Sequence, residues 1–201
     1  MEGKNGTSPQ TKTYFEEYLT YEDDTDNRYE LIDGELVTLP PESGPNNFIA
    51  NYLLFTLASS GLIPLMLIRT HVCEIQVPIL RDGDAANRYP DLVVLQPEHI
   101  LLTASRLTVT LDMPPPRLVV EVVSPGRIGR ERDYERKRAQ YAARGIPEYW
   151  IVDPQEQLIA IFRLESGQYV EVGIFQGTQA MQSPTFPLLN LTAGQVFAGE
   201  F

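Results

Sequence analysis

The chain has 201 residues, 43% of them apolar and 21% charged, which is typical of one globular domain with a sizeable core and excludes a disordered or fibrous protein. Its net charge of −11 excludes a generic polybasic nucleic-acid binder, so any contact with nucleic acid must come from a local patch. Cys73 is the only cysteine, which excludes an internal disulfide framework and a cysteine-rich zinc site.

The location of the protein is predicted from its apolar stretches. The longest one, residues 62–68, contains Pro64 and is too short to span a membrane. The first twelve residues are polar and lack the apolar run of a signal peptide. We therefore expect a cytoplasmic protein with a flexible leader over residues 1–12 and a single domain over residues 13–201.

The first elements expected along the chain are a short helix, a β-ribbon and a longer helix. The turn of the ribbon is Asp33-Gly34, because both positions of a two-residue hairpin turn need a positive φ. Asn46 or Asn47 is the expected N-cap of the longer helix. The expected ranges are residues 13–19 for the short helix, 28–32 and 35–39 for the ribbon, and 46–60 for the longer helix.

The middle of the chain predicts a sheet with one crossover helix. The strands have alternating or continuous apolar residues, and the helix is charged and ends at Gly145. Strands are expected at residues 72–80, 90–95, 117–123 and 148–153, with the helix at residues 129–144 before the last of them. Two further strands, 158–164 and 168–175, form a C-terminal hairpin. The order helix, three strands, helix, strand predicts an α/β (α+β) fold.

Two acidic residues stand at apolar strands of this sheet. Glu121 lies inside the buried run 118–123, and an ionised carboxylate there must be neutralised, paired or metal-bound. A buried salt bridge to an arginine is as good an interpretation as a metal site. Asp91 precedes another apolar strand and, taken alone, is better explained as a turn residue. Together, the two acids are typical ligands of a hard cation such as Mg²⁺, which promotes phosphodiester hydrolysis.

The crossover helix carries the basic residues that such a site needs. Lys137 is the only lysine beyond residue 12, and it shares a helix face with Asp133 and Tyr141. The alternative for Lys137 is a surface ion pair with Asp133. Residues 127–144 include seven basic and three acidic side chains, so this segment is either a patch for a polyanion or a solvated helix face. His71 and His99 have no ligand spacing to each other and are expected to be structural.

The motifs of the chain, in this order, resemble those of the bacterial Uma family of restriction-endonuclease-like proteins. The resemblance covers roughly residues 14–190. The motifs that carry it are Tyr29-Glu-Leu-Ile-Asp-Gly-Glu35, Pro90-Asp91, Leu118-Val-Val-Glu-Val-Val-Ser-Pro125, Asp133 with Lys137 and Tyr141, and Gly145-Ile-Pro-Glu-Tyr-Trp-Ile-Val-Asp-Pro154. The combination of Glu-Val-Val-Ser-Pro with Glu-Tyr-Trp-Ile-Val-Asp-Pro is specific.

The resemblance implies the PD-(D/E)XK nuclease superfamily, with a restriction-endonuclease-like core and DNA as substrate. It implies Mg²⁺ or Mn²⁺ bound by Asp91, Glu121 and the main-chain carbonyl of Val122, with Glu35 as a candidate extra ligand. The superfamily's lysine would lie at Val123, so Lys137 is the candidate replacement on the next helix. The expected nucleic-acid-binding residues are Arg127, Arg130, Lys137 and Arg138.

Two functions remain open at this point. The first is a metal-dependent DNA endonuclease, for which a homodimer is plausible because restriction-type enzymes cut two strands. The second is a catalytically degenerate domain that keeps the nuclease fold and acts as a nucleic-acid or protein interaction module. The acidic net charge and Val123 in place of lysine favour the second function somewhat.

Overall fold

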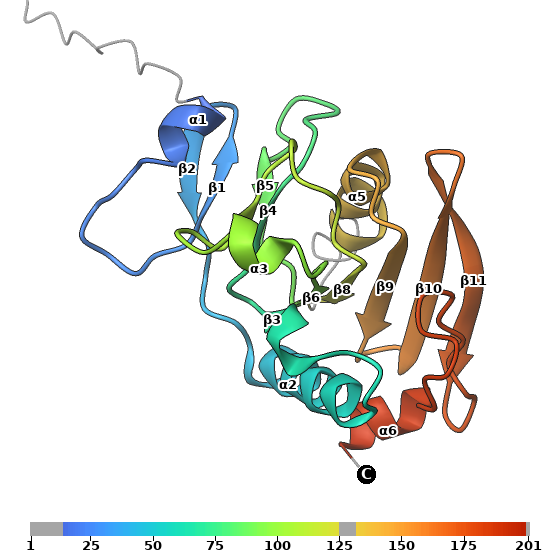
Figure 1. The fold of residues 1–201 in the computed structure, drawn as a ribbon. Coiled ribbons are helices and arrows are strands. Elements are labelled where there is room, and N and C mark those ends of the chain that lie inside the picture. Colours follow the sequence, from blue (N-terminus) through green and yellow to red (C-terminus); the bar gives the residue numbers. More distant parts are fainter. Residues whose placement is uncertain (1–13, 125–131, 200–201) are drawn as a thin grey trace, which may run out of the picture.

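The fold is described from a computed structural model for residues 14–124 and 132–199 (Figure 1). Its centre is a mixed six-stranded sheet with the order β11-β10-β9-β8-β6-β3. The strands are β3 (Ile68–Thr70), β6 (Leu92–Val94), β8 (Leu118–Val122), β9 (Glu148–Asp153), β10 (Leu158–Glu165) and β11 (Gln168–Gln176). The leader expected over residues 1–12 lies outside the described residues.

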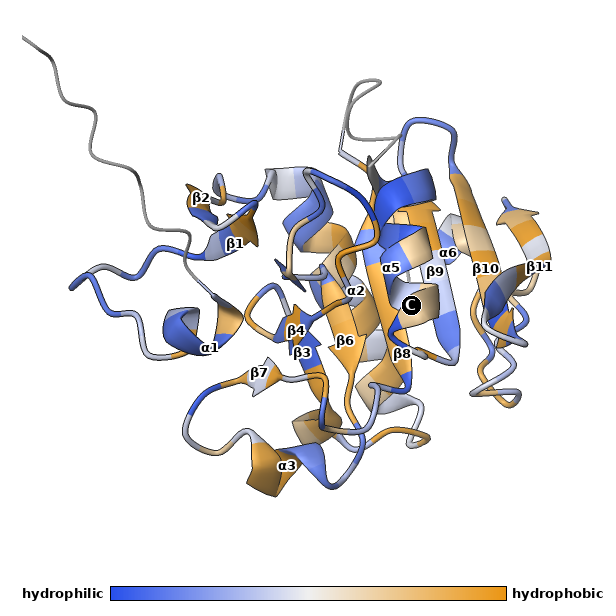
Figure 2. Ribbon diagram, turned by 90° about the horizontal axis from the view of Figure 1, so that it is seen from above, coloured by the Kyte–Doolittle hydropathy of each residue, from blue (hydrophilic) through white to orange (hydrophobic). Residues whose placement is uncertain are grey.

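The strands β8 and β9 are parallel neighbours, and the other neighbouring pairs of this sheet are antiparallel. Between β8 and β9 the chain passes through a π-helical segment, η2 (Arg132–Lys137), and the helix α5 (Arg138–Ala143). Every residue of β8 and β9 is buried. Figure 2 shows the apolar colour running along β6 and β8. The predicted crossover and the α+β class are therefore confirmed.

Helices cover both sides of the sheet. The helix α2 (Gly44–Ser59) contacts β3, β6 and β8, and also the C-terminal helix α6 (Ala193–Ala198). Figure 1 shows α2 and α6 together at the lower side of the sheet and α5 at the opposite side. No helix in residues 14–124 or 132–199 combines the length and apolarity needed to cross a bilayer.

Smaller elements flank the edge of the sheet that carries β3. The predicted hairpin is present, and its turn residues have φ values of 51° at Asp33 and 84° at Gly34, which a two-residue turn of this kind requires. A separate sheet with the order β5-β4-β7 lies beside it. The bounds are α1 (Phe15–Tyr18), β1 (Tyr29–Ile32), β2 (Glu35–Thr38), η1 (Leu65–Leu67), β4 (Glu74–Gln76), β5 (Asn87–Arg88), α3 (His99–Leu102) and β7 (Thr108–Val109).

Two local predictions are wrong. The N-cap of α2 is Ser43, whose side chain accepts from the backbone N–H of Asn46 at 3.2 Å. This leaves the Asn46 side chain free to turn inward, and Pro45 fits the first turn because it needs no N–H donor there. Of the strand expected over residues 72–80, only β4 forms, and it lies in the small sheet. Pro78 cannot extend it, because proline has no backbone N–H to donate to a neighbouring strand. The first strand of the main sheet is β3, which begins where the apolar run 62–68 ends.

Candidate active site

Asp91 lies directly before β6, and its carboxylate is held by the neighbouring strand β8. Its Oδ2 accepts a hydrogen bond of 2.6 Å from the backbone N–H of Val122. Its Oδ1 lies 3.3 Å from Nδ1 of His71. Asp91 is 7% exposed. The side chain is therefore oriented from both sides and is not simply a solvated turn residue.

Glu121 projects from β8 towards the crossover helix, where two side chains hold it. Its Oε2 lies 2.7 Å from Nζ of Lys137, and its Oε1 accepts a hydrogen bond of 2.6 Å from the hydroxyl of Tyr141. The Lys137 ammonium is also 3.0 Å from Oδ1 of Asp133. The buried salt bridge considered for Glu121 thus exists, but its partner is a lysine instead of an arginine.

The expected pair of Asp133 and Lys137 is buried instead of lying on the surface. The side chain of Lys137 is 9% exposed and that of Asp133 is 1% exposed. Both belong to the π-helical segment η2, a widened turn that is common at functional sites. The hydroxyl of Tyr149, on β9, donates to the main-chain oxygen of Asp133 at 2.9 Å. This contact fixes the widened turn against the sheet.

Gln140 anchors α5 from the other side. Its amide nitrogen donates to the carbonyls of Pro78 and Ala85 at 2.8 Å each. Its amide oxygen accepts hydrogen bonds from Nε and Nη2 of Arg88, at 3.0 and 2.7 Å. The remaining guanidinium nitrogen of Arg88, Nη1, donates to the carboxylate of Glu30. Gln140 follows Lys137 by about one helical turn. The buried network around Gln140 therefore helps to fix the position of Lys137 along the helix axis, opposite Glu121.

The electrostatics of the site leave an excess of negative charge. Burial raises the pKa of Glu121 to about 8; Lys137 opposes this shift, while Asp91 and Asp133 add to it. The pKa of Tyr141 is raised well above its ordinary value, mainly by burial, so its hydroxyl keeps the proton that it donates. The Lys137 ammonium contacts Glu121 and Asp133, and Asp91 lies close enough to add to the negative charge at Glu121. A divalent cation in the pocket would offset that charge.

A pocket with a volume of about 250 Å³ opens onto these groups. Its lining includes Glu30, Glu42, Tyr89, Asp91, Glu121, Val122, Ser124 and Lys137. The carbonyl of Val122, expected as a ligand, accepts a hydrogen bond of 3.2 Å from the side chain of Asn46. A carbonyl oxygen has two lone pairs, so this bond leaves room for one more.

The structure gathers only some of the residues singled out from the sequence. Glu35 is exposed on β2 and does not line the pocket with Asp91. Arg138 points to β10 and β11, with its guanidinium 4.2 Å from the centroid of the Phe162 ring and 3.1 Å from the oxygen of Tyr169. Arg127 and Arg130 lie outside the described residues.

The basic segment is largely used inside the molecule where the structure describes it. Arg136 pairs with Asp84 at 2.9 Å, and Arg144 donates to main-chain oxygens of the segment 110–114. Lys137 and Arg138 have the partners given above. Residues 132–144 therefore resemble a helix face paired with acids elsewhere more than a free patch for a polyanion.

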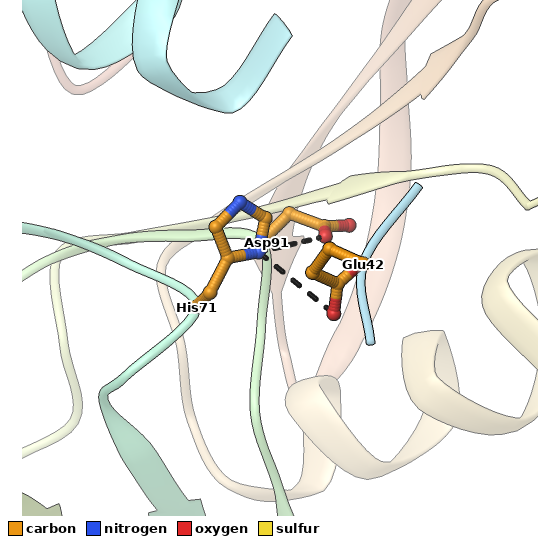
Figure 3. Close-up of side chains that lie close together, drawn as sticks. All are labelled: Glu42, His71 and Asp91. Atoms are coloured by element: carbon orange, nitrogen blue, oxygen red, sulfur yellow. Dashed lines mark ion pairs between the residues drawn. The ribbon is translucent and has the colours of Figure 1, made fainter. Parts of the chain in front are cut away.

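Two residues near Asp91 were not expected at the site. Glu42, in the loop before α2, has Oε1 at 3.9 Å from Nδ1 of His71 (Figure 3). His71 follows β3 in a turn, and nothing in its spacing to His99 points to a ligand. Glu42 lies among polar loop residues without a periodic pattern. Only the approach of both loops to β6 brings them to Asp91.

Comparisons with known proteins agree with this architecture. A family model for Uma2, described as "Putative restriction endonuclease", matches residues 15–194. A crystal structure of a putative nuclease belonging to DUF820, from Anabaena variabilis, superposes with a TM-score of 0.64 at 19% sequence identity, over 91% of this chain and 96% of that chain. This likeness shows a shared fold. No curated protein matches the chain significantly.

Proposed function

The chain belongs to the Uma2 family, which is described as a family of putative restriction endonucleases. On that premise we propose that the protein is an endonuclease that depends on a divalent cation and hydrolyses phosphodiester bonds in DNA. The observation that carries the proposal is one pocket in which Asp91, Glu121 and Lys137 meet. Carboxylates with an ammonium beside them form a donor set suited to a cation and a phosphate together.

Asp91, Glu121 and the carbonyl of Val122 are the proposed cation ligands. The backbone N–H of Val122 orients the carboxylate of Asp91. The strand β8 thus holds one proposed ligand through its main chain and provides the other as the side chain of Glu121. A bound Mg²⁺ or Mn²⁺ would lower the pKa of a nearby water and offset charge on the phosphate. Burial raises the pKa of Glu121, and Asp91 and Asp133 add to the shift, so a bound cation would favour the ionised carboxylate.

Lys137 is proposed to replace the lysine that the resemblance would place at Val123. Val123 is buried, whereas Lys137 reaches the same carboxylate from the opposite element and lines the pocket. An ammonium there can orient the attacking water or neutralise charge that develops on the scissile phosphate. Because Lys137 is tied to Glu121 and Asp133, its position is set before a substrate binds.

Arg127 and Arg130 are proposed phosphate contacts. Both follow β8 in sequence, so a mutation of both to alanine should weaken DNA binding without changing cation affinity. Contacts to phosphate should also make binding weaken as salt is raised. A homodimer, proposed from the cutting of two strands, should be visible by sedimentation in the presence of DNA.

One observation favours the degenerate interaction module instead. Both oxygens of Glu121 already have partners, one in Lys137 and one in Tyr141, so its hydrogen-bonding capacity is satisfied without a cation. A structural ion pair of this kind would survive the loss of activity. Cation binding is therefore the measurement that separates the two functions.

The test is a calorimetric titration of Mg²⁺ and Mn²⁺, with and without a catalytically inert DNA duplex. Wild type is compared with Glu121→Gln, which keeps the size of the side chain, and with Glu35→Gln, an exposed control. Binding by wild type and the control but not by Glu121→Gln is expected. Equal affinity in all three proteins would reject Glu121 as a ligand. An absence of binding even with DNA would support the interaction module.

A further inference from the structure

His71, Asp91 and Glu42 bring one nitrogen and two carboxylates together beside the pocket. One ligand atom from each of the three lies within 4.8 Å of the others. The distances from Nδ1 of His71 are 3.3 Å to Oδ1 of Asp91 and 3.9 Å to Oε1 of Glu42. Figure 3 shows the Nδ1 edge of the imidazole facing both carboxylates, which come from separate loops.

The backbone of His71 is held in an unusual conformation that aims the ring. Its φ is 59°, a left-handed value that costs free energy for a residue other than glycine. The backbone N–H of Val72 closes a tight turn around it by donating to the oxygen of Thr70 at 2.7 Å. The N–H of His71 donates to the main-chain oxygen of Asp91 at 3.2 Å, and its own oxygen accepts from Arg28. The main chain of His71 is thus tied to the loop of Asp91.

The ring nitrogens of His71 are buried and, within the described residues, neither makes a hydrogen bond. The side chain is 11% exposed, and the nearest charged atom to Nδ1 is Oδ1 of Asp91 at 3.3 Å. A buried imidazole normally gives one nitrogen a donor role and the other an acceptor role. A cation that accepts electron pairs from all three groups would satisfy this nitrogen and both carboxylates together.

The spacing and charge fit such a ligand. Two donor atoms that each lie about 2.1 Å from a tetrahedral ion are about 3.4 Å apart. The separation of His71 and Asp91 matches this value, and Glu42 needs a small movement. Glu42 is free to make it, because its side chain is 31% exposed and its ion pair with Arg28 is 3.7 Å long.

We propose that Glu42, His71 and Asp91 form a cation site that selects a first-row transition ion, Mn²⁺ or Zn²⁺, over Mg²⁺. A neutral imidazole suits first-row transition ions, Zn²⁺ in particular, better than it suits Mg²⁺, which prefers oxygen. The site deepens the proposed function and rests on it through Asp91, which serves both cation positions. It is distinct from the first position because it uses neither Glu121 nor Lys137.

The test uses the full chain with the Glu121 position disabled. In Glu121→Gln, Mn²⁺ is added and pulsed electron paramagnetic resonance measures nitrogen coupling to the ion. The second protein is the double variant that carries His71→Asn as well. Asparagine tolerates a left-handed φ but has no imidazole nitrogen to bind the cation. Zn²⁺ and Mg²⁺ affinities are measured by calorimetry in wild type, His71→Asn, Glu42→Gln and the exposed control Glu35→Gln. Thermal melts verify that each variant is folded.

Nitrogen coupling to Mn²⁺ is expected in Glu121→Gln and should disappear with His71→Asn. Zn²⁺ affinity should fall at least about tenfold in His71→Asn and in Glu42→Gln, with Mg²⁺ affinity unchanged. Mn²⁺ bound without nitrogen coupling, or Zn²⁺ affinity equal in all variants, would overturn the proposal. If Glu121→Gln binds neither ion while wild type binds Mg²⁺, this site fails and the proposed function stands. If Glu121→Gln binds Mg²⁺ as wild type does, the proposed function fails while the nitrogen coupling still decides this site.

Discussion

Replacing Glu121 with glutamine should make the protein more stable at alkaline pH and should remove the part of the pH dependence of its stability that Glu121 contributes. Glutamine keeps the volume of the side chain. Its amide oxygen can still accept from Lys137, and its amide nitrogen can donate to the hydroxyl of Tyr141. Lys137 also keeps its contact with Asp133. The substitution therefore removes a buried negative charge without leaving a cavity.

The magnitude follows from the titration of Glu121. Burial raises its pKa from the ordinary 4.5 to about 8. Between these two pH values the folded protein holds a proton that the unfolded chain has released, so the free energy of unfolding falls as the pH rises. The stabilising effect of the proton is complete below pH 4.5 and lost above about pH 8. At about 1.4 kcal/mol per pKa unit, the loss is on the order of 5 kcal/mol, a large part of the stability of an ordinary domain.

Urea denaturation of wild type and Glu121→Gln at half-unit steps from pH 5 to pH 9 measures this difference. All other titrating groups are common to both proteins, so the difference between the two curves isolates Glu121. The wild-type curve should fall across this range relative to that of the variant. Saturating Mn²⁺ should flatten the wild-type curve, because a bound cation favours the ionised carboxylate. Parallel curves without cation would refute the buried, proton-binding Glu121 described here.

Three further predictions concern the side chains that hold Glu121 and its helix. Lys137→Met should lower the free energy of unfolding by about 3–5 kcal/mol at pH 8, because it leaves buried carboxylates without their ammonium. It should also abolish DNA cleavage while cation binding persists. Full cleavage in a folded variant would reject Lys137 as a participant. Tyr141→Phe should cost about 1–3 kcal/mol and raise the pKa of Glu121 further, which would move the fall in stability to higher pH. Gln140→Leu should cost about 3 kcal/mol, because it leaves Nε and Nη2 of the buried Arg88 without their acceptor while the bond to Glu30 remains. Urea denaturation measures this loss, and an unchanged midpoint would mean that the network does not anchor the helix.

Several elements could be predicted from the sequence because their signals are local. The hairpin at Asp33-Gly34 depends on two adjacent residues that tolerate positive φ, and the structure has it. The strands β8 and β9 were recognisable as continuous apolar runs, since strands covered on both faces carry few polar residues. The strand β3 was not recognisable, because only three residues pair and the apolar run before them also suits a helix or a loop.

The sequence by itself determined which groups have the chemistry of a cation and phosphate site. Asp91 and Glu121 stand out because carboxylates are costly in apolar strands, and Lys137 because no other lysine lies beyond residue 12. Only the tertiary structure decided their partners. The salt bridge from Lys137 to Glu121 crosses from a helix to a strand, and the contact of His71 with Asp91 joins two loops. Such contacts depend on how segments that are far apart in the sequence pack against one sheet. The pattern of residues along the chain does not give the distance in space between those segments.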